Sequence, residues 1–288
     1  MGKKSVLMSK YQLIDSGDRK KLEQVGDYVL IRPALNAAWR PRLTEREWER
    51  ADGVFERDSS GGGRWTWRNG GVPSAWTAEW GGFKLLVKPT NFGHLGFFAE
   101  QYQTWDWLRQ TVKGLSGPVK TLNLFAYSGI ASMAMAEAGA EVTHLDAAKG
   151  MNDWGKENQK LNPQVPDRIR WIADDVFKFV AREQRRGNKY QGIVLDPPSF
   201  GRGPKGELWK IEDSAIPLLE SCKTLLDATR PHFVALSCHS PGFSPIVLER
   251  LLECVFGAGT AESGEMTVPD RDGKLLPAGM FARFRSRG

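Results

Sequence analysis

The sequence predicts an α/β protein in which a larger domain with a mostly parallel, seven-stranded sheet follows a small β-rich domain. Two observations support this fold class. From about residue 121 onward, apolar strand-like segments alternate with helical ones, and eight of the eleven tryptophans lie before residue 110. Repeated strand–helix units imply a parallel sheet with helices on both faces. We therefore predict a Trp-rich N-terminal domain at 1–115 and an α/β domain at 116–288.

The N-terminal domain is expected to consist of short strands. The segment RWTWRNGGVPSAWTAEW (64–80) has the pattern of a β-hairpin around a turn at Asn69-Gly70-Gly71, and FKLLVKPT (83–90) follows as another strand, closed by Pro89. We interpret the tryptophans as packing between strands, although exposed ones could stack on nucleic acid bases.

Five strands of the larger domain are each followed by a helix, and two further strands end the chain. The first five are TLNLF (121–125), EVTHLD (141–146), IRWIAD (169–174), YQGIVLD (190–196) and HFVALSC (232–238), and the helices are expected at 131–139, 150–162, 176–187, 216–228 and 245–256. EMTV (265–268) and MFARFR (280–285) flank a turn at Asp272-Gly273 and should form an antiparallel pair. Ligands bind beyond the carboxyl ends of the strands in such sheets, so a site is expected there.

The charge distribution favours nucleic acid as a partner. The formal net charge is +6, from 40 Lys and Arg against 34 Asp and Glu. The cations form four clusters: Arg19, Lys20 and Lys21; Arg40, Arg42, Arg46 and Arg50; Arg182, Arg185, Arg186 and Lys189; and Arg283, Arg285 and Arg287. Clusters of this kind neutralise phosphates, although each alone is also typical of a solvated face.

Several other classes of protein are not expected. No apolar run approaches the roughly 20 residues that span a bilayer, and the opening residues lack the apolar segment of a signal peptide. Cys222, Cys238 and Cys254 are odd in number and have no metal-ligand spacing. We therefore expect a cytoplasmic protein without a metal site or membrane partner, and nothing in the sequence indicates an oligomeric state.

The first two strand ends have the features of a nucleoside site. Residues 123–129, NLFAYSG, lead from a strand through a small-residue turn into a helix, which lets the backbone approach a nucleotide. The turn lacks the G-x-G-x-x-G pattern, which counts against a dinucleotide. Asp146 ends the second strand seventeen residues after Gly129. A carboxylate there can accept hydrogen bonds from ribose hydroxyls, although it could also cap a helix.

The third and fourth strand ends add further polar and aromatic groups. Asp175 can hold an adenine amino group and Phe177 can line the ring, although Asp is also a common helix N-cap. The fourth strand ends at Asp196-Pro197-Pro198-Ser199-Phe200. Two prolines cannot continue a ladder and fix the chain, so they hold Asp196 at the open end of the sheet, with Phe200 available to stack on a planar substrate.

The string NLFAYSG, then Asp146, Asp175 and DPPSF, in order over about 80 residues, resembles class I S-adenosylmethionine-dependent methyltransferases, which have a Rossmann-like fold. More narrowly, it resembles the branch of bacterial 23S ribosomal RNA methyltransferases that modify cytosine C5 or guanine N7. FGHLGFFAEQ (92–101) is similar to that branch's G-x-F-x-D-Q element, with Glu100 replacing Asp and Tyr102 replacing Arg. The N-terminal segment resembles uncharacterised members that lack an RNA-binding PUA domain. The resemblance covers most of the chain.

The resemblance implies roles for individual residues. The residues expected to contact the cofactor S-adenosylmethionine are Asn123, Phe125, Tyr127 and Gly129 of the first turn, Asp146 at the ribose, Asp175 at the adenine and Gln101 at the methionine part. Asp196 and Phe200 are expected to face the target base. We further expect the segment from Phe92 to Gln101 to bring the N-terminal domain to the cofactor.

Cys238 has two interpretations. The fifth strand ends at Ser237-Cys238-His239, where cytosine-C5 members of the branch carry a Cys. Attack of its thiolate on C6 would make C5 nucleophilic, a route that needs an activated thiol. Alternatively, Cys238 is a core residue, as free Cys often is, and the target atom is a nitrogen that needs no covalent step.

Three functions are compatible with the sequence. The first is an S-adenosylmethionine-dependent methyltransferase acting on an RNA base, with ribosomal RNA favoured by DPPSF, the basic clusters and the resemblance. The second is a methyltransferase acting on a small molecule or a protein, because no recognisable RNA-binding module is present. The third is a nicotinamide-dependent oxidoreductase, suggested by the alternating pattern but opposed by the missing glycines.

Overall fold

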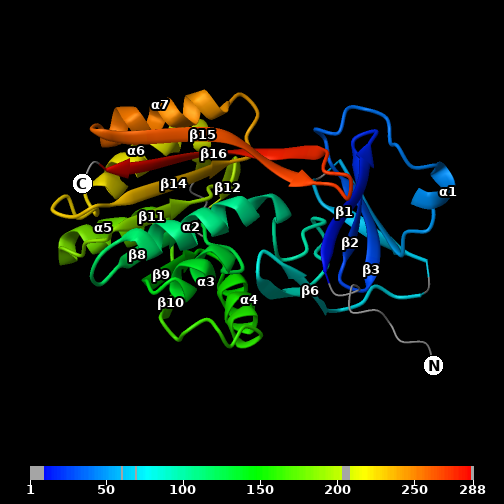
Figure 1. Cartoon of the computed structure of the whole chain (residues 1–288), viewed down its shortest axis with the longest axis horizontal. Helices are drawn as coiled ribbons and strands as arrows, with labels where there is room; N and C mark the ends of the chain where they lie inside the picture. The colour runs from blue at the N-terminus through cyan, green and yellow to red at the C-terminus, as the bar shows by residue number, and fades with distance from the viewer. Residues whose placement is uncertain (1–9, 60, 69, 203–207, 287–288) are drawn as a thin grey trace. The chain divides into compact units, whose positions relative to one another are not determined.

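A computed structural model describes residues 10–59, 61–68, 70–202 and 208–286. The chain divides into two compact units (Figure 1). The N-terminal unit is Met1–Tyr102 with Thr267–Ala278, and the C-terminal unit is Gln103–Met266 with Gly279–Gly288. The tip of the last hairpin therefore groups with the N-terminal unit. The two folding domains at 1–115 and 116–288 stay a prediction, because compactness alone does not test independent folding.

The N-terminal unit contains a five-stranded sheet with the order β1-β2-β3-β4-β5. Its strands are β1 (Tyr11–Gly17), β2 (Lys20–Val25), β3 (Tyr28–Pro33), β4 (Gly53–Arg57) and β5 (Gly63–Trp67). Neighbouring strands are antiparallel except β3 and β4, which are parallel and are separated in sequence by the short helix α1 (Glu45–Trp48). A separate two-stranded sheet consists of β6 (Trp76–Trp80) and β7 (Phe83–Val87). The β-rich character predicted for this part of the chain is confirmed.

The predicted hairpin at 64–80 is wrong. β5 pairs with β4 and β6 pairs with β7, so the segments on either side of Asn69-Gly70-Gly71 lie in different sheets, and Asn69 itself lies outside the described residues. The hairpin that forms instead turns at Gly81-Gly82, where Trp80 pairs with Phe83. Both glycines have positive φ, at 58° and 84°. A two-residue turn with two positive φ angles matches the twist of the paired strands and favours glycine.

The tryptophans of this unit take part in packing and hydrogen bonding. Trp76 lies edge-on to Tyr28, with ring centroids 4.9 Å apart, and its indole N–H donates to the Val25 carbonyl at 2.8 Å. The Trp80 indole N–H donates to the Ala99 carbonyl at 2.9 Å. Buried tryptophans need such acceptors for their N–H groups. These contacts support the packing interpretation over base stacking for Trp76 and Trp80.

A buried charge network crosses the five-stranded sheet. The Glu23 carboxylate is fully buried and accepts a hydrogen bond from Arg32 Nε, and it lies 3.2 Å from Lys21 Nζ. Arg32 also donates to the Gly93 carbonyl at 2.8 Å. Burial alone would raise the pKa of Glu23, but the two cations outweigh it and hold that pKa at about 2. Lys21, predicted in a basic cluster, is therefore a structural residue.

Replacing Glu23 with Gln should destabilise the N-terminal unit by about 3–5 kcal/mol, because it leaves two buried cations without a counter-charge. Urea unfolding at pH 7 measures this. The wild-type contribution is present above the ordinary carboxyl pKa of 4.5 and is lost as the pH falls through about 2, so the difference between the proteins should shrink in acid. Glu56→Gln, at an exposed position on β4, is the control. Equal stability of Glu23→Gln and wild type at pH 7 would contradict this account.

The C-terminal unit is built on the seven-stranded sheet that the sequence predicts. Its order is β10-β9-β8-β11-β14-β16-β15, with the first five strands parallel and β16 antiparallel to β14. The strands are β8 (Lys120–Leu124), β9 (Glu141–Asp146), β10 (Ile169–Ala173), β11 (Gly192–Leu195), β14 (Phe233–Cys238), β15 (Gly259–Pro269) and β16 (Leu275–Ser286). The chain adds β9 and β10 on one side of β8 and then crosses to the other side, where it adds β11 and β14. The switch point of the strand order therefore lies between β8 and β11.

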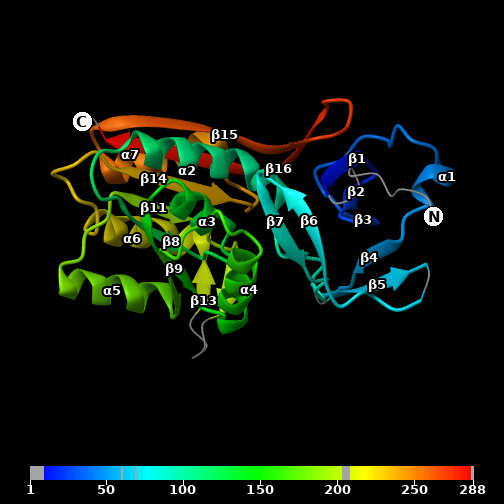
Figure 2. The ribbon, with the colours of Figure 1, turned by 60° about the horizontal axis from the view of Figure 1, so that its bottom comes forward.

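Helices cover both faces of this sheet (Figure 2). They are α2 (Tyr102–Gly114), α3 (Ile130–Glu137), α4 (Lys149–Lys160), α5 (Val176–Arg186), α6 (Ile211–Lys223) and α7 (Pro245–Phe256). The helix predicted at 216–228 begins earlier and ends earlier than expected. Glu212 and Asp213 lie in its first turn, where acidic groups interact favourably with the helix dipole, and Pro217 is accommodated inside it.

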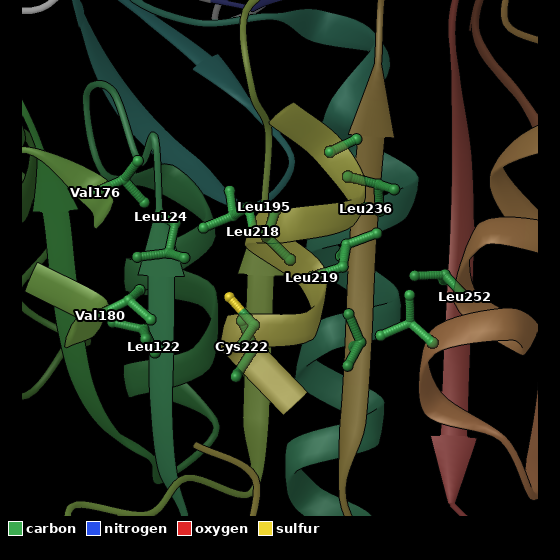
Figure 3. Packing of buried hydrophobic residues seen from close by; sticks show 14 of the residues in the cluster. Leu122, Leu124, Val176, Val180, Leu195, Leu218, Leu219, Cys222, Leu236 and Leu252 are labelled. Atoms are coloured by element: carbon green, nitrogen blue, oxygen red, sulfur yellow. The ribbon is translucent and has the colours of Figure 1, made fainter. Parts of the chain in front are cut away.

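The main core lies between the sheet and helices α5, α6 and α7 (Figure 3). Leu122, Leu195 and Leu236 point from the strands toward Leu218 and Leu252 of the helices. Because alternate residues of a strand point to opposite faces, Phe233 packs on the other side, against Trp107 of α2 at a centroid distance of 5.6 Å. Among the described helices, none is long and apolar enough to cross a membrane.

Candidate active site

A turn with unusual backbone geometry follows β8 at the switch point. Phe125 and Tyr127 have φ of 56° and 50°, in the left-handed region that residues other than glycine seldom adopt. Gly129, with φ of 86°, is the N-cap of α3. Left-handed residues other than glycine persist where the surroundings hold them, and they cluster at ligand sites. The turn after β8 is therefore the part of the backbone best suited to contact a ligand.

Asp146, at the end of β9, holds this turn in place. Its Oδ2 accepts from the Tyr127 backbone N–H at 2.9 Å, and its Oδ1 accepts from the Ala148 N–H at 2.9 Å. Burial raises the pKa of Asp146, against these two hydrogen bonds, which lower it. A carboxylate has about four lone-pair sites, so two remain for ligand hydroxyls. Asp146 can thus position the turn and bind a ribose at the same time.

Asn123 lies beneath the turn. Its side chain is 2% exposed and donates to Ser132 Oγ at 2.9 Å, and that oxygen lies 3.0 Å from His144 Nδ1. Burial lowers the pKa of His144 to about 3, so the ring is neutral at pH 7. This buried chain supports the turn from below. The direct cofactor contact expected of Asn123 stays a prediction.

Gly129 is needed for packing as well as for its backbone angle. A Cβ at Gly129 would lie 2.7 Å from the Trp171 ring, closer than side-chain atoms approach each other. Trp171 in turn packs on His144, with ring centroids 4.4 Å apart. The absence of a side chain at Gly129 therefore leaves the space in which Trp171 packs against His144.

An aromatic cluster lies at the start of α5. Asp175 caps this helix, accepting from the Lys178 backbone N–H at 3.0 Å through Oδ1, which is the helix-cap role that the sequence left open. Trp209 lies 5.0 Å from Phe125 and 6.0 Å from Phe177 between ring centroids. Trp209 is not among the site residues predicted from the sequence. It belongs to an antiparallel pair formed by β12 (Phe200–Arg202) and β13 (Leu208–Lys210), and strands of three residues are too short to show a periodic pattern in the sequence.

The ends of β11 and β14 bring a carboxylate and an imidazole together. Asp196 Oδ1 lies 3.7 Å from His239 Nε2, and Ser240 donates to Ser199 Oγ at 2.6 Å. The Trp209 indole N–H donates to the Pro198 carbonyl at 2.6 Å and so fixes the two-proline turn. Asp196 is therefore held at the open end of the sheet, as the sequence predicts.

Phe200 and Cys238 have opposite environments. The Phe200 side chain is 55% exposed, whereas Cys238 has no exposed surface and belongs to the main core. Burial raises the pKa of the Cys238 thiol, and the nearby Asp196 charge raises it further, against hydrogen bonds from Ser240 that lower it. Activated cysteines have the reverse environment, with partial exposure and a lowered pKa.

Gln101 belongs to the N-terminal unit. It lies in the 3-10 turn η2 (Ala99–Gln101), where it is 7% exposed, next to Glu100 at 6%. The Trp80 hydrogen bond to Ala99 ties this turn to β6. The contact between Gln101 and the cofactor stays a prediction.

A family model described as S-adenosylmethionine-dependent methyltransferase matches residues 59–214 of this chain. The chain belongs to this family. The methyltransferase is 39% identical to a solved S-adenosylmethionine-dependent methyltransferase from Agrobacterium tumefaciens, with a TM-score of 0.90 over 98% of this chain and 92% of that one. A putative methyltransferase from Streptococcus mutans, 18% identical, shares the fold with a TM-score of 0.71 over 98% of this chain and 76% of that one. The family match decides against a nicotinamide-dependent oxidoreductase.

Curated relatives of the methyltransferase include two kinds of ribosomal RNA enzyme. It is 32% identical over 123 residues to ribosomal RNA large subunit methyltransferase I of Aeromonas salmonicida, which covers 42% of this chain and 30% of the relative. It is 31% identical over 147 residues to methyltransferase K/L of Vibrio cholerae, which covers 50% of this chain and 20% of the relative. The similarity therefore spans less than a third of either relative.

The strand ends fit S-adenosylmethionine, the cofactor of the family. The carboxylates of Asp146, Asp175 and Asp196 follow β9, β10 and β11. Carboxylates attract a sulfonium cation and repel a pyrophosphate, so this set of groups suits a nucleoside with a positively charged sulfur. The Phe125, Phe177 and Trp209 rings supply apolar surface for a purine.

Proposed function

We propose that the methyltransferase modifies a base in RNA, and that its substrate is ribosomal RNA. The observation that carries this proposal is that Asp196 and the exposed Phe200 ring both follow β11, four residues apart in sequence. An exposed aromatic ring stacks on a planar base, and a fixed carboxylate recognises the polar edge of that base. The names of the curated relatives, both ribosomal RNA enzymes, support the same substrate class.

The residues at the strand ends have distinct roles in this proposal. Asp146 binds the cofactor ribose, Asp175 binds the adenine amino group through its second oxygen, and the turn at 125–129 lies against the nucleoside. The bound cofactor supplies an electrophilic methyl group. Asp196 and the Pro197 carbonyl hold a base nitrogen toward that methyl group. Pro197 is assigned this role rather than Pro198, because the Pro198 carbonyl already accepts a hydrogen bond from Trp209. The work of the protein is then orientation rather than covalent catalysis.

The buried Cys238 supports transfer to nitrogen over the cysteine-dependent route to carbon C5. A thiolate that attacks C6 has to lie beneath the base, whereas Cys238 has no exposed surface and a raised pKa. Its contacts are those of a core residue in the layer formed with α6 and α7.

Cys238→Ala should therefore retain turnover within about tenfold of wild type, since a covalent nucleophile is worth several orders of magnitude and a small core truncation is not. Methyl transfer to RNA at saturating cofactor measures this. Cys222→Ala, at a buried position on α6, controls for the loss of core packing. Abolished turnover in a folded Cys238→Ala enzyme that still binds cofactor would restore the covalent route.

Fractionated substrates test the proposed function. The enzyme is incubated with methyl-labelled S-adenosylmethionine and, separately, with the total RNA, protein and small-molecule fractions of a bacterial lysate. The proposal predicts label in RNA alone. Label in the protein or metabolite fraction would instead support the second candidate, a methyltransferase for one of those substrates. With ribosomal RNA as substrate, we propose a cytoplasmic location.

A further inference from the structure

A polar cleft lies at the amino ends of β8, β9 and β10. Asp146 and Asp196 lie at the opposite, carboxyl ends of the strands. The volume of the cleft is about 430 Å³. Four of its lining residues are cations, and two, Glu141 and Asp167, are acids. The cations are Lys120, Arg168, Arg170 and Lys189. No part of the proposed methyl-transfer chemistry uses this cleft.

Two residues that line the cleft, Asn188 and Tyr190, belong to a polar network centred on Glu183. The buried Glu183 carboxylate accepts from the Tyr190 hydroxyl at 2.7 Å and from the Asn188 amide at 2.6 Å. Glu183 is also ion-paired with Arg186 at 3.3 Å and interacts electrostatically with Arg170, while the cleft lining itself keeps four cations against two acids. The excess positive charge at the rim is therefore available to an anion from outside the chain.

Helix α5 connects this cleft to the active-site end of the sheet. It begins directly after Asp175, beside the Phe177–Trp209 pair, and ends at Arg186, three residues before Lys189 of the cleft. Its 11 residues span about 16 Å. Arg182 and Arg185 lie on its surface three residues apart, and Arg182 is paired with Asp174 at 2.7 Å. The basic cluster at 182–189 thus continues from the second half of α5 into the segment that lines the cleft.

We propose that the cleft and the end of α5 form a track that binds the phosphate backbone of the RNA substrate. The track is Lys120, Arg168, Arg170, Arg185 and Lys189. This inference rests on the proposed function, because the track would bind the backbone of the same RNA molecule whose target base stacks on Phe200. The track would thus contact RNA at the amino ends of the parallel strands, whereas the proposed cofactor site lies at their carboxyl ends.

The composition of the track favours a phosphate backbone over a protein partner. Guanidinium groups bind phosphate through paired hydrogen bonds, and ammonium groups add point charges. The core of a protein interface is enriched in aromatic residues and depleted of charge, which is the opposite of this surface. The two basic clusters at 40–50 and 283–287 are less suited to RNA. Arg42 is paired with Asp270 and Asp272, both at 2.6 Å, and Arg283 is 8% exposed.

The test is a double substitution, Arg185→Ala with Lys189→Ala, in the full-length enzyme. The probe is unmodified bacterial large-subunit ribosomal RNA made by transcription in vitro. Each phosphate contact contributes about 0.7–0.9 to the slope of log affinity against log salt. The variant should therefore bind RNA about 10- to 30-fold more weakly at physiological salt and show a slope shallower by about 1.5. KM for RNA should rise, and the affinity for S-adenosylhomocysteine should stay the same.

The matched control is Lys113→Ala with Arg250→Ala, which removes two exposed cations from α2 and α7 of the same unit. It should leave the RNA affinity and the salt slope near wild type. The track is wrong if wild type methylates RNA and the track variant matches this control in affinity and slope. If wild type neither binds nor methylates the RNA, the proposed function itself fails. The two failures are therefore distinguishable.

Discussion

Replacing Asp146 with Ala should weaken S-adenosylmethionine binding about a hundredfold or more. In the proposed site, Asp146 accepts two charge-assisted hydrogen bonds from the ribose hydroxyls, each worth about 1.5–3 kcal/mol, and the substitution removes both. The substitution also frees the Tyr127 and Ala148 N–H groups that the carboxylate holds at 2.9 Å, so the strained turn at 125–129 loses its anchor. Titration calorimetry with S-adenosylhomocysteine measures the effect directly.

Two further variants separate the causes of this loss. Asp146→Asn keeps one acceptor oxygen and should lose less affinity than Asp146→Ala. Asp153→Ala removes a partly exposed acid of α4 that pairs with Lys149 and Lys156, and it should bind cofactor like wild type. Unchanged cofactor affinity in a folded Asp146→Ala enzyme would remove Asp146 from the site.

Asp196→Ala should lower kcat for RNA by about a hundredfold to ten-thousandfold, the range for a positioned carboxylate that hydrogen-bonds or takes a proton from the reacting group. The carboxylate lies directly after β11 and 3.7 Å from His239, on a different strand end from Asp146, for which we propose ribose binding. The cofactor affinity should therefore change little. Single-turnover kinetics with saturating cofactor and RNA isolate this step from binding.

The Asp196→Asn variant distinguishes the two ways in which Asp196 can act. An amide oxygen still accepts a hydrogen bond, but it does not take a proton at neutral pH. Activity near wild type in Asp196→Asn would show orientation alone, whereas a loss equal to that of Asp196→Ala would show proton transfer. A normal kcat in the Asp196→Ala enzyme would exclude Asp196 from the reaction.

The sequence predicts the sheet and its strand ends well because both depend on local signals. The apolar runs of β9 and β11 each stop at an aspartate, so Asp146 and Asp196 could be placed from the sequence pattern. The carboxyl ends of parallel strands lie side by side, so residues that are distant in the sequence come together there. Knowing that the strands are parallel is enough to predict this.

Features that depend on distant packing could not be predicted in the same way. Two turn signals compete between 64 and 87: β6 and β7 pair around Gly81-Gly82, whereas β5 pairs with β4, so the signal at 69–71 gives no hairpin. Lys21 and Arg283 belong to sequence clusters of cations, but one is paired with a buried carboxylate and the other stacks on Phe281 at 4.0 Å. Arg287 lies outside the part of the chain that the structure describes.

Arg283 illustrates how packing changes the meaning of a charge. Burial lowers its pKa to about 10, against the Glu262 carboxylate, which raises it. Its guanidinium also lies 5.1 Å from the Trp107 ring, so its contacts are with aromatic faces of the C-terminal unit. A cation in this position stabilises the fold through stacking rather than through binding of nucleic acid.

Nucleoside mass spectrometry tests the central claim most directly. The enzyme is incubated with methyl-labelled S-adenosylmethionine and unmodified large-subunit ribosomal RNA, and the RNA is then digested to nucleosides. The account predicts label on the base of one nucleoside, and an initial rate of labelling about a hundredfold or more lower with the Asp196→Ala enzyme. Label on a ribose, or label confined to protein or small molecules when these are supplied in place of RNA, would contradict it.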